Sequence, residues 1–117
     1  MVDSFTTEMF GTVPVFHIAK YFDEGCGTQL NKTADEHLCA GRLRMIIDFA
    51  GCKVINSPGI GKLLEIVLKV ANDYRGQIVL CGLDTLKRKV FLMATIIPTA
   101  KEAANVDAAL KELSAAA

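Results

Sequence analysis

The segment VINSPGIGK, residues 54–62, holds the side chains of this chain that are best placed to do chemistry. It joins two apolar residues to a helical pattern through one serine, one proline and two glycines. Ser57 would make a good helix N-cap, because its side-chain oxygen can accept a hydrogen bond from the backbone N–H of Gly59 or Ile60. Pro58 would then occupy the first helical position, where a missing N–H costs nothing. The simplest interpretation of Ser57 and Pro58 is therefore structural.

Two functional interpretations of this turn stay open beside the structural one. A nucleotide-binding P-loop has the form G-x-x-x-x-G-K-[ST], but Asn56 stands at the first glycine position and Leu63 replaces the hydroxyl that binds Mg²⁺. NTP hydrolysis is therefore disfavoured, and only weak nucleotide affinity through the helix N-terminus is left. The other interpretation is phosphorylation of Ser57, since the dipole of the following helix favours a phosphate there. Its nearly two negative charges would hinder a partner that docks on the turn.

Other polar side chains give weaker signals. Asp35, Glu36 and His37 precede Cys39 on a predicted helix. Neighbouring residues of a helix point in different directions, and a zinc site needs more than the two ligands that share a face. No metal site is therefore predicted. His17 lies in an apolar strand, and we interpret it as a structural histidine.

The basic residues around two helices have alternative interpretations. Residues 87–89, Lys-Arg-Lys, form either a solvated patch of a helix or a surface for an acidic stretch of a partner. Asp84 is a candidate cap of the same helix. Lys62 lies one turn into the helix that follows Ser57, where it is either simply exposed or able to pair with a phosphoserine.

The composition indicates one folded domain with no strongly charged ligand. The 117 residues suit a single domain, which we expect to span residues 1–117. Hydrophobic residues make up 51% of the chain and charged residues 22%, a balance that favours a globular fold over disorder. The 13 basic and 13 acidic side chains cancel, so nothing points to nucleic acid or an anionic membrane as a partner.

The N-terminal sequence and the cysteines indicate the compartment. The first residues lack the basic and apolar regions of a signal peptide, and no apolar run approaches the ~20 residues that span a bilayer. We therefore expect a cytoplasmic protein without direct membrane insertion. Cys26, Cys39, Cys52 and Cys81 show neither a CxxC pair nor zinc-finger spacing. We expect them to be reduced and mostly buried.

Hydrophobic periodicity predicts the elements that position the turn. The expected strands are a hairpin over residues 5–16 with its turn at Gly11, then residues 44–49, 78–81 and about 99–104. The expected helices cover residues 28–40, 60–74, 86–94 and 106–115. Pro14 indicates that the second hairpin strand starts near an edge or lacks one ladder bond. The alternation predicts an α/β fold: a mixed, mostly parallel β-sheet with an N-terminal antiparallel hairpin and about four helices.

Two segments resemble the STAS domain family. Residues 48–61, DFAGCKVINSPGIG, align without a gap to the central motif D-L-S-G-V-x-x-I-D-S-S-G-L-G of that family. Residues 76–82, GQIVLCG, are similar to its G-G-x-L-x-L-x-G strand. The order of predicted elements also matches, so the resemblance covers nearly the whole chain and implies a STAS-like fold.

The simplest STAS proteins are bacterial anti-sigma factor antagonists, and the resemblance implies that role here. Such proteins are not enzymes and need no cofactor. They bind an anti-sigma factor that is also a serine kinase, and so free a sigma factor for transcription. The kinase, which itself binds the ATP, phosphorylates the serine of this turn, and a metal-dependent serine phosphatase restores it. That serine is Ser57. The expected partner-binding residues around it are Asn56, Pro58, Gly59, Ile60, Gly61 and Lys62.

The chain departs from the family pattern at three positions. Asn56 replaces the usual aspartate, which keeps the acceptor oxygen and removes the charge. Pro58 replaces a serine or threonine, removing a backbone donor and stiffening the turn. Lys20 stands where most members have glycine. The first two changes bear on the kinase reaction more than on the fold.

Two other hypotheses stay open at this point. One is a STAS scaffold subunit without phosphorylation, in a signalling or lipid-transport complex. The other is an enzyme that uses a cysteine or a bound nucleotide. The sheet edges and the turn around Ser57 are also candidate surfaces for a weak homodimer.

Overall fold

A five-stranded sheet forms the centre of the computed structural model, which describes residues 5–115. Its strands lie in the order β1 (Phe5–Phe10), β2 (Val13–Ile18), β4 (Arg44–Asp48), β6 (Gln77–Cys81) and β7 (Lys101–Ala103). The β1–β2 pair is antiparallel and the other pairs are parallel. A separate parallel pair joins β3 (Tyr21–Phe22) to β5 (Val54–Ile55). The predicted mixed, mostly parallel sheet with an N-terminal hairpin is confirmed.

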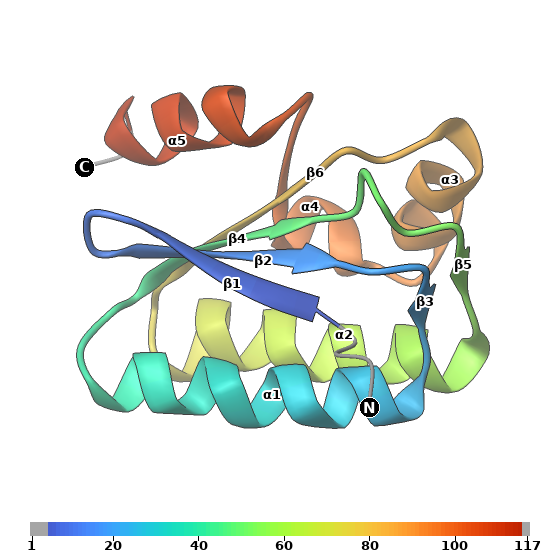
Figure 1. The fold of residues 1–117 in the computed structure, drawn as a ribbon, viewed down its shortest axis with the longest axis horizontal. Coiled ribbons are helices and arrows are strands. Elements are labelled where there is room, and N and C mark those ends of the chain that lie inside the picture. Colours follow the sequence, from blue (N-terminus) through green and yellow to red (C-terminus); the bar gives the residue numbers. More distant parts are fainter. Residues whose placement is uncertain (1–4, 116–117) are drawn as a thin grey trace.

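Helices cover both faces of this sheet (Figure 1). They are α1 (Glu24–Cys39), α2 (Ser57–Leu68) with a π-helical extension η1 (Lys69–Asp73), α3 (Thr85–Met93), α4 (Ile96–Thr99) and α5 (Val106–Ala115). In Figure 1, α1 and α2 run side by side under the sheet and α5 lies above it. Residues 5–115 form five α-helices where the sequence predicted about four, because a short helix forms around Pro98. No helix within residues 5–115 is long and apolar enough to cross a membrane.

Alternate residues of the central strands serve two separate cores. Phe16, Ile47 and Leu80 point to the α1–α2 side, where they belong to the larger cluster of buried side chains. Their neighbours Val15 and Ile46 point to the α5 side, where they pack with the residues Val79, Ala109 and Leu113. Full burial of one large apolar side chain stabilises a fold by roughly 1.5–3 kcal/mol. This two-faced burial fixes the register of β2, β4 and β6, since a shift by one residue would exchange the faces.

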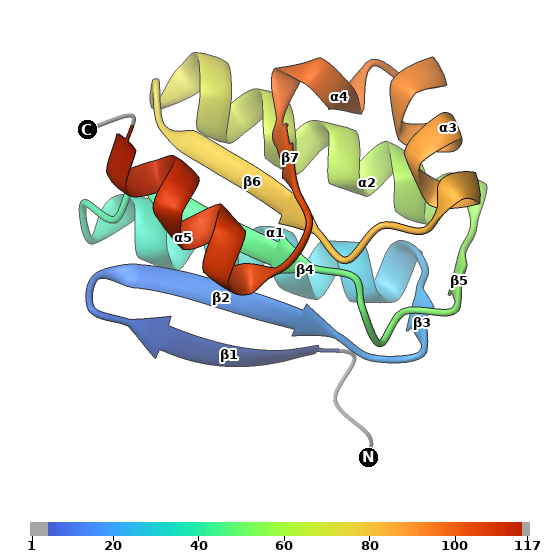
Figure 2. The ribbon, with the colours of Figure 1, turned by 90° about the horizontal axis from the view of Figure 1, so that it is seen from above.

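The α5 side of the sheet is only partly covered. Seen from above, α5 lies over the middle of the sheet and leaves the β1–β2 hairpin largely uncovered (Figure 2). The hairpin turns at Gly11, whose φ of 63° suits glycine. β2 is an internal strand, but its pairing with β4 begins only at Val15, so the strand starts without a neighbour on that side, in agreement with the first alternative that Pro14 indicated. Pro14 is tolerated because it precedes Val15, the first residue that pairs with β4.

Helix α1 begins at Glu24, earlier than the predicted start near residue 28. Gly25 and Gly27 have low helix propensity, yet both lie inside the first turns of the helix. Asp23 supplies the cap: its Oδ1 accepts from the backbone N–H of Cys26 at 2.8 Å. Gly27 is needed for packing, because a β-carbon there would lie 2.4 Å from Cβ of Lys62 on α2. Close contact between the two helices therefore outweighs the low helix propensity of glycine.

We predict that Gly27→Ala destabilises the protein by about 1–3 kcal/mol, because the new methyl group forces α1 and α2 apart. Gly25→Ala is the matched control, since a β-carbon there meets only Asp23 Oδ1 at 3.5 Å. Urea unfolding followed by far-UV circular dichroism would measure both. Equal stabilities for the two variants would show that the α1–α2 contact is not tight.

Candidate functional site

The turn before α2 is capped by Asn56, one residue earlier than the sequence predicted. Asn56 has an extended backbone, with φ −98° and ψ 171°, and its Oδ1 accepts from the N–H of Gly59 at 2.9 Å. Ser57 is therefore the first residue of the helix and Pro58 the second. The predicted cap at Ser57 is wrong because asparagine is an equally good cap. A shift of one residue lets the extended chain of β5 run directly into the helix.

The new assignment of the cap changes the role of the serine. Ser57 is exposed, and within residues 5–115 its hydroxyl makes no hydrogen bond. Asn56 satisfies the backbone donor that a capping serine would have satisfied. The Ser57 hydroxyl therefore stands free in solvent at the first turn of α2.

Backbone contacts hold this turn against β3. A β-carbon at Gly59 would lie 2.3 Å from the carbonyl oxygen of Phe22, so only glycine fits. The same oxygen accepts from the N–H of Asn56 at 3.3 Å. Gly61 differs, since it is exposed and a β-carbon there would meet nothing within 4 Å. The missing side chain of Gly59 thus serves a close contact within the chain itself, with β3.

A groove opens beside the turn, between β5, the start of α2, and α3. Its volume is about 250 Å³, and its lining residues are Lys53, Val54, Ile55, Ile60, Asp84, Leu86, Lys87 and Val90. Two apolar residues of its lining face solvent, since Val54 is 50% exposed and Leu86 is 71% exposed. Apolar side chains in a groove next to a free hydroxyl form a surface that a partner could cover.

The solvated patch that was one of the two predictions for residues 87–89 is confirmed for Arg88 and Lys89, which are exposed, and is wrong for Lys87. Lys87 is buried, at 5% exposure, and its Nζ contacts Asp84 Oδ2 at 2.8 Å. Asp84 Oδ1 accepts from the backbone N–H of Lys87 at 2.7 Å, which confirms Asp84 as the cap of α3. The hydrogen bond from the Lys87 side chain, followed by the one from its backbone, lowers the pKa of Asp84. Arg88 points elsewhere and pairs with Glu102 at 2.8 Å.

Lys62 contacts other residues than Ser57. Its Nζ lies 3.5 Å from Glu65 Oε2, one turn further along α2. Its stem packs against Gly27 of α1, where it is half-buried. Pairing of Lys62 with a modified Ser57 would need the side chain to leave Glu65, so this pairing stays a prediction.

A second group of titratable residues crosses the α5 side of the sheet. His17 Nδ1 lies 2.8 Å from Asp48 Oδ2, and His17 Nε2 lies 2.9 Å from Glu8 Oε1. These contacts confirm His17 as a structural histidine. Burial by itself lowers the pKa of His17. The hydrogen bonds and charges of Glu8 and Asp48 raise this pKa by a larger amount, so the net shift is upward. His17 thus bridges the edge strand β1 to β4, and the upward shift of its pKa favours the imidazolium form.

Cys81 is not an activated nucleophile. Cys26, Cys52 and Cys81 are buried, as predicted for most of them, and Cys39 is exposed. Burial, then the nearby charge of Asp48, raises the pKa of Cys81 to about 12. A reactive cysteine needs the thiolate near neutral pH, and Cys81 stays a thiol there.

The Asp-Glu-His segment of α1 does not assemble a metal site. Asp35 Oδ1 pairs with Lys69 Nζ at 2.6 Å. His37 packs its ring against Phe16, with ring centroids 5.7 Å apart. Throughout residues 5–115 there is no group of three or more histidine, cysteine, aspartate or glutamate side chains that could hold a metal ion.

The comparisons with known proteins rest on structure. No family model matches the chain, and no curated protein matches it by sequence. A proposed anti-sigma factor antagonist from Thermotoga maritima superposes with a TM-score of 0.82, at 14% identity over 94% of each chain. RsbS from Moorella thermoacetica, carrying a serine-to-glutamate substitution, gives 0.81 at 16% identity over 96% of each chain. The Bacillus cell fate determinant SpoIIAA in its phosphorylated form gives 0.73 at 20% identity, over 92% of this chain and 97% of that protein.

Likeness at 14–20% identity establishes the fold. The chain therefore has the STAS fold over nearly its whole length, as the motif in residues 48–61 implied. The resemblance to anti-sigma factor antagonists predicted from the sequence is supported at this level.

We predict that Asn56→Ala lowers the free energy of unfolding by about 1 kcal/mol, because the N–H of Gly59 loses its capping oxygen. Ser57→Ala should change it by less than about 0.5 kcal/mol, since an exposed hydroxyl without a partner is removed. Chemical denaturation of both variants beside the wild type would measure the difference. A larger loss of unfolding free energy in Ser57→Ala than in Asn56→Ala would show that Ser57 is the cap of α2.

We predict that the bridge at His17 weakens as the pH rises. The pKa of His17 is raised in the folded state, so its stabilisation is complete below about pH 6.5 and is lost as the pH rises through the folded pKa. The group is partly exposed, so screening limits the change to below about 1 kcal/mol.

His17→Gln is the comparison for this pH effect. Burial, then Arg42, lowers the pKa of His37, which titrates nearby with the opposite sign. The difference in unfolding free energy between wild type and His17→Gln, measured from pH 5.5 to 8.5, removes that second contribution. The wild type should lose its advantage as the pH rises, and an advantage that grows with pH would show that the bridge does not act through the imidazolium.

Proposed function

We propose that residues 1–117 act as a single STAS domain that works as an anti-sigma factor antagonist. It binds an anti-sigma factor serine kinase and is switched off by phosphorylation at Ser57, which regulates sigma-dependent transcription. The observation that supports this proposal best is the free, exposed hydroxyl of Ser57, left without a structural task because Asn56 caps α2. The chain performs no catalysis in this proposal, and it needs no cofactor.

A phosphate at this position would leave the fold intact and change the surface. The helix N-terminus stabilises an exposed anion by roughly 0.3–1 kcal/mol. Asn56 is neutral, so no carboxylate repels the phosphate from the neighbouring residue. The modification then places nearly two negative charges on the docking turn, and a partner must either desolvate them or leave.

The docking surface of this proposal combines the turn with the groove beside α3. Asn56 and Pro58 are exposed on the turn, and Gly61 offers an open stretch of helix without a side chain. Ile60 lies in the wall of the groove, next to the exposed apolar side chain of Leu86. Apolar contact in the groove would supply affinity, and the serine beside it would supply control.

In this proposal the partner proteins catalyse both phosphorylation and dephosphorylation. The kinase brings ATP to Ser57, and a metal-dependent serine phosphatase removes the phosphate again. Support comes from two proteins of the same fold: SpoIIAA, which exists in a phosphorylated form, and RsbS, in which a serine has been replaced by glutamate.

A scaffold subunit that is never phosphorylated is the second candidate. The observation that favours it is Pro58, the second residue of α2, which has no N–H to donate and stiffens the chain directly after the serine. In this role the same turn and groove would hold a permanent partner in a signalling or lipid-transport complex.

Ser57→Ala distinguishes the two candidates. The wild-type protein, recovered from the cells that make it, should carry one added phosphate by intact mass, and Ser57→Ala should carry none. Ser57→Ala should also retain the kinase in a pull-down under conditions in which the wild type releases it. Ser114→Ala is the matched control, because Ser114 is an exposed serine on α5, across the sheet from α2. An unmodified Ser57 in every growth phase, with identical partners for all three proteins, would favour the scaffold.

A further inference from the structure

The two edges of the five-stranded sheet differ in how well they are protected. At one edge, β7 has three residues, and two of them, Lys101 and Glu102, are charged. At the other edge, β1 has six residues, FTTEMF, and only Glu8 is charged. Proteins usually protect an edge strand by shortness, charged side chains, proline or a bulge. β1 has six consecutive residues paired with β2 without a bulge, and it contains no proline, so its outer side is open to another strand.

The register of the hairpin determines which backbone groups of β1 face outward. The two-residue loop at 11–12 closes with a hydrogen bond between Phe10 and Val13. Hydrogen-bonded and non-hydrogen-bonded pairs alternate in an antiparallel ladder, so every second residue counted back from Phe10 directs its N–H and C=O toward β2. The residues that direct these groups away from the sheet are Phe5, Thr7 and Met9. Figure 2 shows no other element of residues 5–115 beyond this side of β1.

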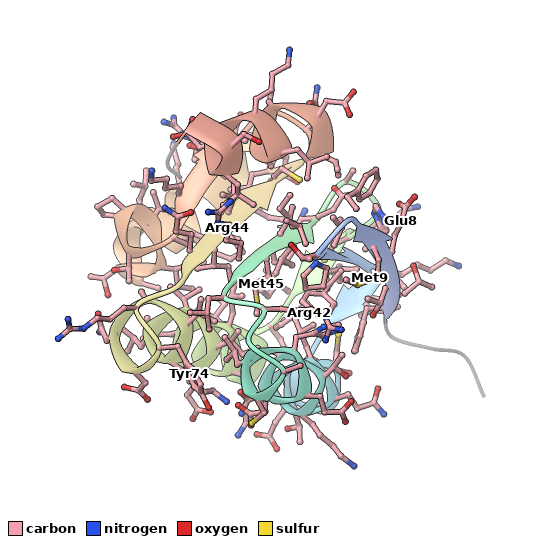
Figure 3. All side chains as sticks on the ribbon, turned by 90° about the vertical axis from the view of Figure 1, so that its left-hand side faces the viewer. Glu8, Met9, Arg42, Arg44, Met45 and Tyr74 are labelled. Carbon is pink, nitrogen blue, oxygen red and sulfur yellow. The ribbon has the colours of Figure 1, made fainter. Side chains whose placement is uncertain are left out.

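The side chains of β1 leave this outer side accessible. Phe5 packs on Phe16 of the α1–α2 core, with ring centroids 6.0 Å apart, so Met9 lies on that same face and is 43% exposed. Glu8 lies on the opposite face, where its Oε1 is 2.9 Å from Nε2 of His17. Figure 3 labels Glu8 and Met9 on the two faces of the strand. The only charge of β1 is therefore paired within the chain and does not repel a strand that approaches along the edge.

We propose that β1 pairs antiparallel with β1 of a second copy of this chain, with Thr7 on the two-fold axis between them. In this register Thr7 lies opposite Thr7 of the second copy, and Phe5 lies opposite its Met9. All three outward-facing residues of each copy then take part, and each pair exchanges two backbone hydrogen bonds. The two sheets become one continuous sheet, and the open edge is lost from both copies.

The side chains opposite one another in this register are compatible on both faces. On the α1–α2 face, a threonine pair and a contact between the Phe5 ring and the Met9 sulfur are both favourable. On the other face, Thr6 lies opposite Glu8 of the second copy, and its hydroxyl can donate to the carboxylate oxygen that His17 does not use. No like charges stand directly opposite. The strand is thus complementary to itself, as a two-fold interface requires.

A single pair of short strands makes a small interface. Stable complexes usually bury about 1,200–2,000 Å² of surface, and weak, transient ones bury less. We therefore expect a reversible dimer that forms at high protein concentration. Sedimentation equilibrium of the full chain, from about 20 μM to about 1 mM, should show the mean mass rising from that of a monomer toward that of a dimer. A monomer mass throughout this range would overturn the proposal.

Amide hydrogen exchange over the same concentrations tests the geometry. Exchange at Phe5, Thr7 and Met9 should slow about threefold or more at the highest concentration, because only the dimer protects these amides. Exchange at Thr6, Glu8 and Phe10 should not depend on concentration, since β2 already pairs with them. Protection that appears on β7, or around the groove beside α3, in place of the three outward-facing amides would overturn the proposal.

Thr7→Lys should abolish the dimer, because it places two lysines opposite each other on the axis. Thr6→Lys is the matched control: it adds the same charge one residue away, opposite Glu8 of the second copy, and should dimerise at least as well as the wild type. Circular dichroism would show that both variants are folded. A dimer that persists in Thr7→Lys, or an equal loss in Thr6→Lys, would overturn the proposed pairing.

A mixture of variants tests the two-fold axis. Thr7→Glu should also be a monomer by itself, whereas an equimolar mixture of Thr7→Glu and Thr7→Lys should form a mixed dimer, because the opposite charges then face each other. Absence of the mixed dimer would show that Thr7 is not on the axis. Ser57→Ala should dimerise like the wild type, so this proposal and the phosphorylation switch can fail independently.

Discussion

The contact between the start of α2 and the end of β3 constrains most of what this molecule can do. Gly59 places its Cα so close to the carbonyl oxygen of Phe22 that no side chain fits between them, and that oxygen also accepts from the N–H of Asn56. The helix must therefore begin at Ser57. Its cap, its exposed serine and the groove beside it all follow from this one backbone contact.

The sequence pattern predicted the order of elements well, because hydrophobic periodicity reports directly on burial. Its errors fall where a contact from elsewhere in the fold decides the outcome. In the sequence Gly27 indicates a break in the helix. In the structure Lys62 of α2 occupies the space that a β-carbon at residue 27 would need. The sequence pattern indicates that Lys87 is solvated, whereas in the structure its side chain pairs with Asp84. No local pattern contains those partners.

The candidate site was predictable in place but not in detail. The motif around Ser57 located the turn, and the proline after it correctly indicated a helix start. Asparagine and serine are equally good caps, so sequence alone could not choose between Asn56 and Ser57. The extended backbone that β5 imposes at Asn56 made the choice, and that strand is only two residues long, too short to be recognised from the sequence.

The long helix also separates the two ends of the molecule electrically. α2 and its extension η1 have 12 and 5 residues, which at 1.5 Å per residue span about 25 Å. The Debye length at physiological ionic strength is only about 8 Å. A charge placed on Ser57 is thus screened long before it reaches Arg42 and Arg44 at the opposite end of the molecule. Each end can therefore acquire or lose charge without altering the electrostatic potential at the other end.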